Sequence, residues 1–285
     1  MSDEAYGATV AKRRLSRRLT ELRRASGHTA NHVCDLLDWG RGKVGRFEAN
    51  HWKRPEMSDI RDLLRVYGVG DEERAELEAL AMQARVKPWW RDYSDVFANE
   101  FAGFENDAVQ IRVFMPLLLP GLLQTRDYAE AVLRVVTKPP IWRERAAEAR
   151  MRRQHILDRT DGTAPKLIAV ITEASLMYQW GTKAERLEQI DYLVKAAERP
   201  NVELRIQRFA DGPHRGLWSM IDIFDFEDGE PSVVYLESDI AIQEVTDNDD
   251  LMAYGEGFSR SRDSALEPAD TTQYLKYLAE QLELA

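Results

Sequence analysis

Cysteine and long apolar segments are almost absent from this sequence of 285 residues. The single cysteine, Cys34, excludes an intramolecular disulfide framework and any cysteine-based zinc site, and is typical of a reducing compartment. The longest apolar candidate, residues 114–123, contains two prolines and a glycine and is shorter than the ~20 residues of a membrane span. Residues 1–18 lack the apolar core of a signal peptide. We therefore expect a cytoplasmic protein with no membrane partner.

Motifs for metals, cofactors and catalysis are also missing. His28 and His32 are four residues apart, but Thr29 would begin a helix between them, so we expect no metal site. No P-loop, no GxGxxG after a predicted strand and no GxSxG motif occurs. The sequence therefore points to no cofactor and to no catalytic residue.

A few side chains could still serve chemistry. Four carboxylates lie on or beside predicted strands and could pair as acid and base: Glu173, Asp222, Asp225 and Glu237. Because the chain has 49 acidic residues, such neighbours are expected by chance, and we expect no enzyme. His214 is the best single candidate for a ligand-facing residue, although a loop histidine is more often simply exposed.

The net charge of −10 is unevenly distributed. Residues 12–54 contain twelve basic and four acidic side chains, so this segment carries +8 and the remainder −18. Such asymmetry is typical of a basic module that binds an anionic partner beside a larger acidic module, although a solvated helical face gives the same pattern. We expect two domains, over residues 1–85 and 86–285.

Hydrophobic spacing predicts about five helices in the first domain, a mainly α bundle. They cover residues 10–25, a segment from 30 to 37, and residues 41–48, 57–67 and 71–84. Gly27 is predicted to end the first helix, Thr29 to cap the second and Asp71 to cap the fifth. Two short helices joined by a tight turn containing glycine, at residues 38–40, indicate a helix-turn-helix.

The stretch LSRRLTELRRASGHTANHVCDLLDWGRGKVGRFEAN, followed by RPEMSDIRDLLRVYGV, resembles helix-turn-helix regulators of the XRE class, which are related to lambdoid phage repressors. The resemblance covers about residues 10–84, and its most specific pieces are GRGKVGRFE and LLRVYGV. It implies that the third helix enters the major groove of DNA. By position, the base-contacting residues are Arg41, Lys43 and Arg46, and the phosphate-contacting residues are Arg17, Arg18, Thr29, Asn31, Lys53 and Arg54.

The sequence departs from that family at several positions. Ala30 stands where the family usually has glutamine, and the predicted third helix is rich in glycine, with Gly40, Gly42 and Gly45. Interior glycine costs a helix roughly 0.5–1 kcal/mol per residue. We therefore expect tertiary contacts through Val44 and Phe47 to hold this helix.

The second domain alternates strands and helices, which predicts an α+β fold with a small sheet. The strands are expected at residues 109–119 and in KLIAVI, VELRIQRF, WSMIDIFDF and SVVYLES, with Asp228-Gly229 forming a hairpin turn between the last two. Helices are expected over 126–136, 142–159, 173–180, 184–197, 247–262 and 268–284. The arginine-rich helix 142–159 is most simply a solvated, salt-bridged face.

The segments LLPGLLQTRDYAEAVL, MRRQHIL, RPNVELRIQRF and VVYLES resemble a domain of unknown function that accompanies XRE-class modules in actinobacterial WhiJ-like, antitoxin-like regulators. The resemblance covers nearly all of residues 88–285, and PGLLQTxxYA is its most specific element. It implies a small partner protein, encoded nearby, that the C-terminal domain engages.

We therefore expect a sequence-specific regulator, a repressor or an antitoxin-like protein, that binds operator DNA as a homodimer in the nucleoid. Its acidic domain is expected to sense a small protein or ligand. The alternative is a protein-protein interaction module whose DNA binding is vestigial.

Overall fold

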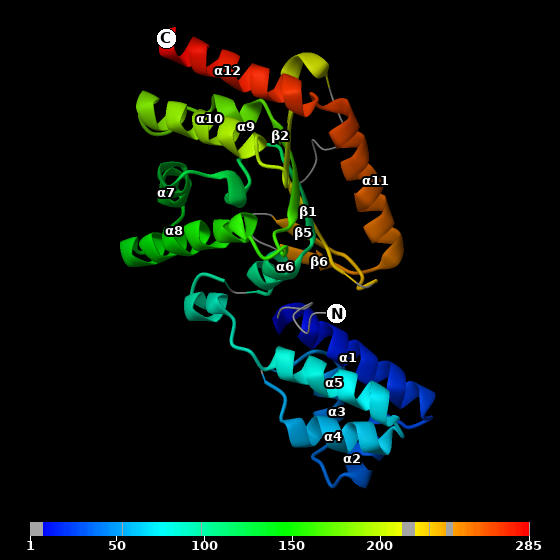
Figure 1. Cartoon of the computed structure of the whole chain (residues 1–285). Helices are drawn as coiled ribbons and strands as arrows, with labels where there is room; N and C mark the ends of the chain where they lie inside the picture. The colour runs from blue at the N-terminus through cyan, green and yellow to red at the C-terminus, as the bar shows by residue number, and fades with distance from the viewer. Residues whose placement is uncertain are drawn as a thin grey trace. The chain divides into compact units, whose positions relative to one another are not determined.

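The computed structural model describes residues 8–52, 54–97, 99–212, 220–227, 229–237 and 242–284 (Figure 1). The chain divides into two compact units between Arg91 and Asp92. The first unit is entirely helical where it is described, and the second is built on a six-stranded sheet. No described helix is both long and apolar enough to cross a membrane.

Five helices form the first unit: α1 (Ala8–Ala25), α2 (Ala30–Leu36), α3 (Lys43–Glu48), α4 (Met57–Val66) and α5 (Asp71–Ala84). The apolar spacing of each helix directs its inward side chains into one core, in which Leu15, Val33, Val44, Leu63 and Ala81 are almost fully buried. The predicted helical bundle is confirmed.

The boundaries of α1 and α2 follow the predicted capping residues. Gly27 has φ +73°, the left-handed conformation that ends a helix at little cost when the residue is glycine. The Thr29 hydroxyl accepts a hydrogen bond from the backbone N–H of His32 at 3.2 Å and so caps α2. The predicted cap of α5 is wrong by one residue, because Gly70 is the cap and Asp71 is the first helical residue.

The third helix is shorter than its predicted span of residues 41–48. It begins at Lys43, and its capping residue Gly42 has φ +84°. Gly40 and Arg41 therefore lie in the turn before the helix, and of the three glycines only Gly45 is inside it. Gly40 and Gly42 thus belong to the turn, and only Gly45 can weaken the helix.

The sheet of the second unit has the strand order β3-β2-β1-β4-β5-β6. Its strands are β1 (Gln110–Met115), β2 (Lys166–Thr172), β3 (Val202–Gln207), β4 (Met220–Asp225), β5 (Val233–Glu237) and β6 (Ile242–Val245). Strands β1, β2 and β3 are parallel, whereas β4, β5 and β6 continue the sheet in antiparallel pairs. On the central strand, Val113 is level with Ala169 on β2 and with Asp222 on β4.

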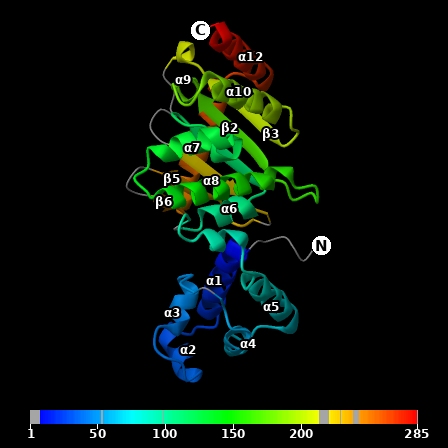
Figure 2. The same ribbon diagram turned by 90° about the vertical axis from the view of Figure 1, so that its left-hand side faces the viewer.

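Helices cover both faces of the sheet (Figure 1). They are α6 (Phe101–Asp107), α7 (Arg126–Arg134), α8 (Pro140–Gln154), α9 (Ala174–Met177), α10 (Lys183–Ala197), α11 (Asn248–Ser264) and α12 (Pro268–Leu284). One face packs on α11, where Phe114, Ile168, Ile223 and Phe258 form a buried cluster. In Figure 2, α7 and α8 lie in front of the opposite face. The predicted α+β architecture is confirmed.

The arginine-rich helix α8 is not simply a solvated face. Arg153 donates to both carboxylate oxygens of Glu105, at 2.6 Å each, and Glu105 is only 3% exposed. The Arg159 guanidinium, just beyond this helix, binds the carbonyl and side-chain oxygens of Asn106. These contacts attach α6, which the sequence did not predict, to the end of α8. The predicted salt bridges are confirmed, but the prediction of a solvated face is wrong at Arg153, which is 13% exposed because it pairs with a residue about fifty positions away.

Candidate DNA-binding interface

The turn between α2 and α3 is held by its own backbone and by two aromatic side chains. The Trp39 N–H donates to the Cys34 carbonyl at 2.8 Å, and Asp38 before it has φ +52°. The Trp39 ring lies 6.4 Å from the Phe47 ring, centroid to centroid. Since Cys34 and Phe47 are buried in the core, the turn is fixed relative to both helices.

An ion pair between Arg23 and Glu48 joins α1 to α3. The Arg23 guanidinium donates to both carboxylate oxygens of Glu48, at 2.5 and 2.9 Å, and to the His28 carbonyl at 2.7 Å. Both side chains are about 15% exposed. The hydrogen bonds to Glu48 raise the pKa of Arg23, so the guanidinium stays charged. Arg23 thus joins α1, the start of α2 and the end of α3.

Lys43, predicted to contact bases, is engaged within the protein. Its Nζ donates to Asp59 Oδ1 on α4 at 2.7 Å and lies 3.9 Å from the centroid of the Trp39 ring. Its side chain is 29% exposed. The structure therefore gives Lys43 a positioning role, joining the first turn of α3 to α4.

Arg41 and Arg46, the other two predicted base contacts, are exposed. Neither forms an ion pair with another residue that the structure describes. Arg46 Nη1 lies 3.8 Å from the position that a Cβ atom on Gly42 would occupy, so its guanidinium lies over the start of α3. Two arginine side chains are thus available at the turn and on α3.

The predicted phosphate-contacting residues differ in whether the protein already engages their side chains. Asn31 and Arg54 are exposed and have no hydrogen bond or ion pair within the described chain, whereas Lys53 lies outside the described residues. Thr29 is exposed and uses its hydroxyl as the cap of α2. Arg17 lies 3.8 Å from the carboxylate of Glu21.

Arg18 is bound within the protein. Its guanidinium donates to Glu21 at 2.5 Å and also to Glu73 on α5. These two hydrogen bonds raise the pKa of Arg18. Arg18 therefore joins α1 to α5 and is poorly placed for a phosphate contact.

Trp52 has a positioning role that the sequence analysis missed. Its Nε1 donates to Ser16 Oγ on α1 at 3.1 Å and to the Phe47 carbonyl at 3.2 Å. Asn50, with φ +58°, accepts from Ser16 at 3.3 Å. The signal in the sequence was Ser16, a polar residue next to Leu15 on the apolar side of α1, which the structure shows to be buried. These contacts fix the chain that leads from α3 towards Arg54.

Comparison with known families identifies both units. A family model described as a helix-turn-helix domain matches residues 14–77, and one described as a domain of unknown function, DUF5753, matches residues 98–277. The chain belongs to the DUF5753 family. No curated protein and no solved structure matches it. A helix-turn-helix domain binds DNA through the second helix of its motif, which is α3 in this chain. The chain is therefore a DNA-binding regulator in broad terms.

The DUF5753 region contains the candidate carboxylates, and the structure does not bring them together. Glu173 accepts hydrogen bonds from Tyr274 Oη at 2.5 Å and from the Phe209 N–H at 2.7 Å. Asp225 accepts two from Arg112, at 2.8 Å each. Asp222 is buried, and its position in β4 directs it to the face opposite Asp225. The Glu237 side chain and His214 lie outside the described residues.

Burial raises the pKa of Asp225, but the hydrogen bonds of Arg112, Gln110 and Ser232 outweigh that effect and lower it overall. Asp225 is therefore an ionised structural group. Among the candidate carboxylates, Glu173 and Asp225 therefore have structural partners.

Proposed function

We propose that this protein is a sequence-specific transcriptional regulator of the XRE class, a repressor or antitoxin-like regulator that binds an operator in double-stranded DNA. The observation that carries the proposal is the exposure of two arginines, Arg41 in the turn before a fixed recognition helix and Arg46 on that helix. Neither pairs with another described residue, whereas Lys43 nearby is engaged by Asp59. An arginine guanidinium can donate two hydrogen bonds to the O6 and N7 atoms of guanine.

The assembly is part of the proposal. Regulators that place a short helix in the major groove usually bind as dimers to two half-sites about 34 Å apart. We therefore propose a homodimer in the nucleoid, whose acidic C-terminal unit senses a small partner protein encoded nearby or a ligand. The proposal includes no catalytic step, because Glu173 and Asp225 have structural partners.

The test begins with genome-wide recovery of the DNA that the protein binds, followed by affinity measurements on the recovered operator. Arg46→Ala is expected to cost about 1–3 kcal/mol of binding free energy and to relax specificity at one base position. The matched control is Arg65→Ala, which removes an exposed arginine from the last turn of α4, where it pairs with Asp62. Equal affinities of the two variants, with an unchanged footprint, would contradict the assignment.

One observation favours the alternative, a protein-protein interaction module with vestigial DNA binding. The recognition helix has only six residues, and one of its predicted base contacts, Lys43, is paired with Asp59. A salt titration distinguishes the two functions, because phosphate contacts lower log K by about 0.9 per contact for each unit of log salt concentration. A flat titration favours the interaction module.

A further inference from the structure

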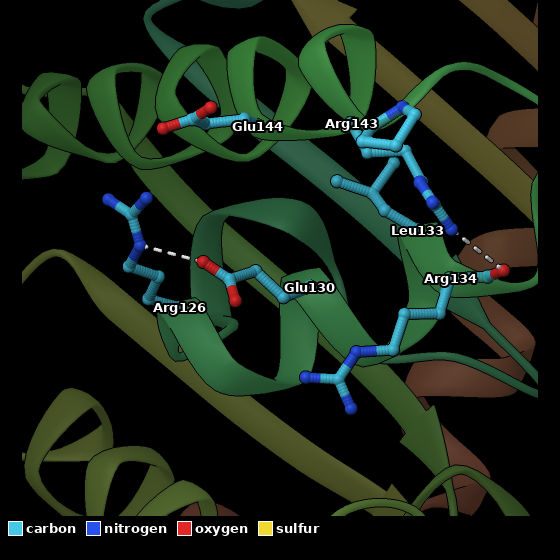
Figure 3. Close-up of a pocket in the computed structure, with 7 residues that line it drawn as sticks. Arg126, Glu130, Leu133, Arg134, Arg143 and Glu144 are labelled. Atoms are coloured by element: carbon cyan, nitrogen blue, oxygen red, sulfur yellow. Dashed lines mark hydrogen bonds and ion pairs between the residues drawn. The ribbon is translucent and has the colours of Figure 1, made fainter.

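A pocket with a volume of about 400 Å³ lies between α7 and α8 in the DUF5753 region. Its charged lining consists of Arg126, Glu130 and Arg134 from α7 and Arg143 and Glu144 from α8, and Leu133 and Pro140 supply its apolar wall (Figure 3). The volume falls within the roughly 300–1,000 Å³ of typical ligand pockets, which combine an apolar wall with a few convergent polar groups.

The charges of the pocket are only partly compensated. Arg126 Nε donates to Glu130 Oε1 at 2.8 Å, so these two residues neutralise each other. Arg143 reaches from α8 to the carbonyl oxygen of Arg134 at 3.5 Å, which is a weak and uncharged contact. Neither Arg134 nor Arg143 has a carboxylate within ion-pair distance among the residues described, and Arg134 interacts with Glu185 at longer range. Figure 3 shows the Glu144 carboxylate pointing away from Arg143.

The surroundings add positive charge and apolar surface. Residues 126–159 contain nine basic and five acidic side chains, whereas residues 92–285 as a whole contain 21 basic and 35 acidic ones. The pocket therefore lies on the basic segment of an acidic unit. Val135, directly after α7, and Ile141, in the first turn of α8, are 84% and 66% exposed. Exposed apolar side chains near guanidinium groups that form no ion pair suit a molecule with an apolar body and an anionic head.

We propose that the pocket between α7 and α8 binds a small organic anion, whose carboxylate or phosphate is held by Arg134 and Arg143 and whose apolar body lies against Leu133 and Pro140. Guanidinium groups bind both kinds of anion through paired, charge-assisted hydrogen bonds. This inference specifies the ligand half of the sensing role in the proposed function. Binding itself requires no DNA, so it is testable separately.

The experiment titrates the full-length, ¹⁵N-labelled protein with phenyl phosphate, benzoate and benzyl alcohol in the absence of DNA. At least one anion is expected to shift the resonances of residues 126–144 in a saturable way, and neutral benzyl alcohol is expected to bind at least tenfold more weakly. The tighter of the two anions distinguishes a phosphate ligand from a carboxylate ligand.

Four variants test the lining. Arg134→Gln and Arg143→Gln are each expected to weaken anion binding roughly tenfold, the usual loss for a charge-assisted hydrogen bond. Glu144→Gln is expected to tighten it severalfold, because it removes from the pocket lining a negative charge that repels an anion. The control is Arg260→Gln, which removes an exposed arginine from α11, where it pairs with Glu256.

The inference is overturned if neither anion saturates, if benzyl alcohol binds as tightly as the anions, or if Arg143→Gln behaves like Arg260→Gln. DNA binding is measured on the same samples without the probes. Anion binding without operator binding would leave the pocket assignment intact and remove the proposed regulatory function. Operator binding without anion binding would leave the regulatory function intact and remove the pocket assignment.

Discussion

The Lys43 ammonium group lies between the carboxylate of Asp59, at 2.7 Å, and the ring of Trp39, 3.9 Å from its centroid. Both partners lie outside α3, one on α4 and the other in the turn before α3. The first residue of the recognition helix is therefore bound from both sides. These two contacts hold the first residue of the six-residue helix in place. The hydrogen bonds of the helix cannot do so alone, because short isolated helices are marginal in water.

Breaking this pair is expected to cost stability in the first unit. The side chains are 29% and 17% exposed, so we expect a coupling free energy of about 1 kcal/mol between Lys43→Met and Asp59→Asn in a double-mutant cycle. Urea unfolding followed by the fluorescence of Trp39 and Trp52 measures it. Additive effects of the two substitutions would show that the pair contributes nothing.

Glu48→Gln is expected to lower the free energy of unfolding by about 2–3 kcal/mol, because it leaves the largely buried Arg23 without its counter-charge. It should also weaken operator binding, since Glu48 ends α3. Glu78→Gln is the matched control, because Glu78 pairs with an exposed arginine, Arg61. Equal unfolding midpoints in the two variants would show that the ion pair of Arg23 and Glu48 does not stabilise the first unit.

The two glycines of this region are expected to respond in opposite ways to substitution by alanine. Gly42→Ala should destabilise the first unit by about 1–2 kcal/mol, because alanine is strained at φ +84°. Gly45→Ala should stabilise it by about 0.5–1 kcal/mol, since Gly45 lies inside α3 and a Cβ atom there meets nothing within 4 Å. Thermal unfolding of both variants checks the prediction, which fails if the two shifts have the same sign.

The second unit is expected to lose stability in acid through Asp225. Its folded pKa is lowered, so the stabilisation is fully present above the unfolded pKa of about 3.9 and disappears as the pH falls through the folded value. Asp225→Asn should therefore flatten the decline in stability below about pH 4. The check is urea unfolding between pH 2.5 and 7, followed by a probe in the second unit. Identical slopes for wild type and variant would contradict this account.

Glu105→Gln is expected to destabilise the second unit by about 3–5 kcal/mol, because it removes the carboxylate that pairs with Arg153 at a site where the arginine is 13% exposed. Replacing both residues, as Glu105→Leu with Arg153→Met, should cost less than the single change. Chemical unfolding of the two variants decides the point, and the reverse order of stabilities would refute it.

Local pattern predicted much of the fold. Leu15 and Leu19 placed α1, and Ile60 with Leu63 placed α4, because a helix repeats its buried face every three or four residues. The strand β6 and the helix α6 were missed. The strand has only four residues, and α6 is held by Arg153 and Arg159, about fifty residues away in the chain.

The candidate site was less predictable than the fold, because its contacts are not local. The resemblance selected Arg41, Lys43 and Arg46 together, although Lys43 alone has a carboxylate partner, on α4 and sixteen residues away. Likewise Arg18 meets Glu73 at a separation of 55 residues. Periodicity identifies which face of a helix is polar but does not identify which charges on that face are already paired.

The position of β1 at the centre of the sheet has a consequence for biosynthesis. Its residue Gln110 donates to Asp225 on β4, which is 115 residues later in the chain. At a synthesis rate of about 5–20 residues per second, β1 waits on the order of ten seconds for this neighbour. The helical first unit depends on nearer contacts, and such units fold within milliseconds. A nascent chain therefore carries a finished helix-turn-helix while the sheet that follows it is still without its central pairing.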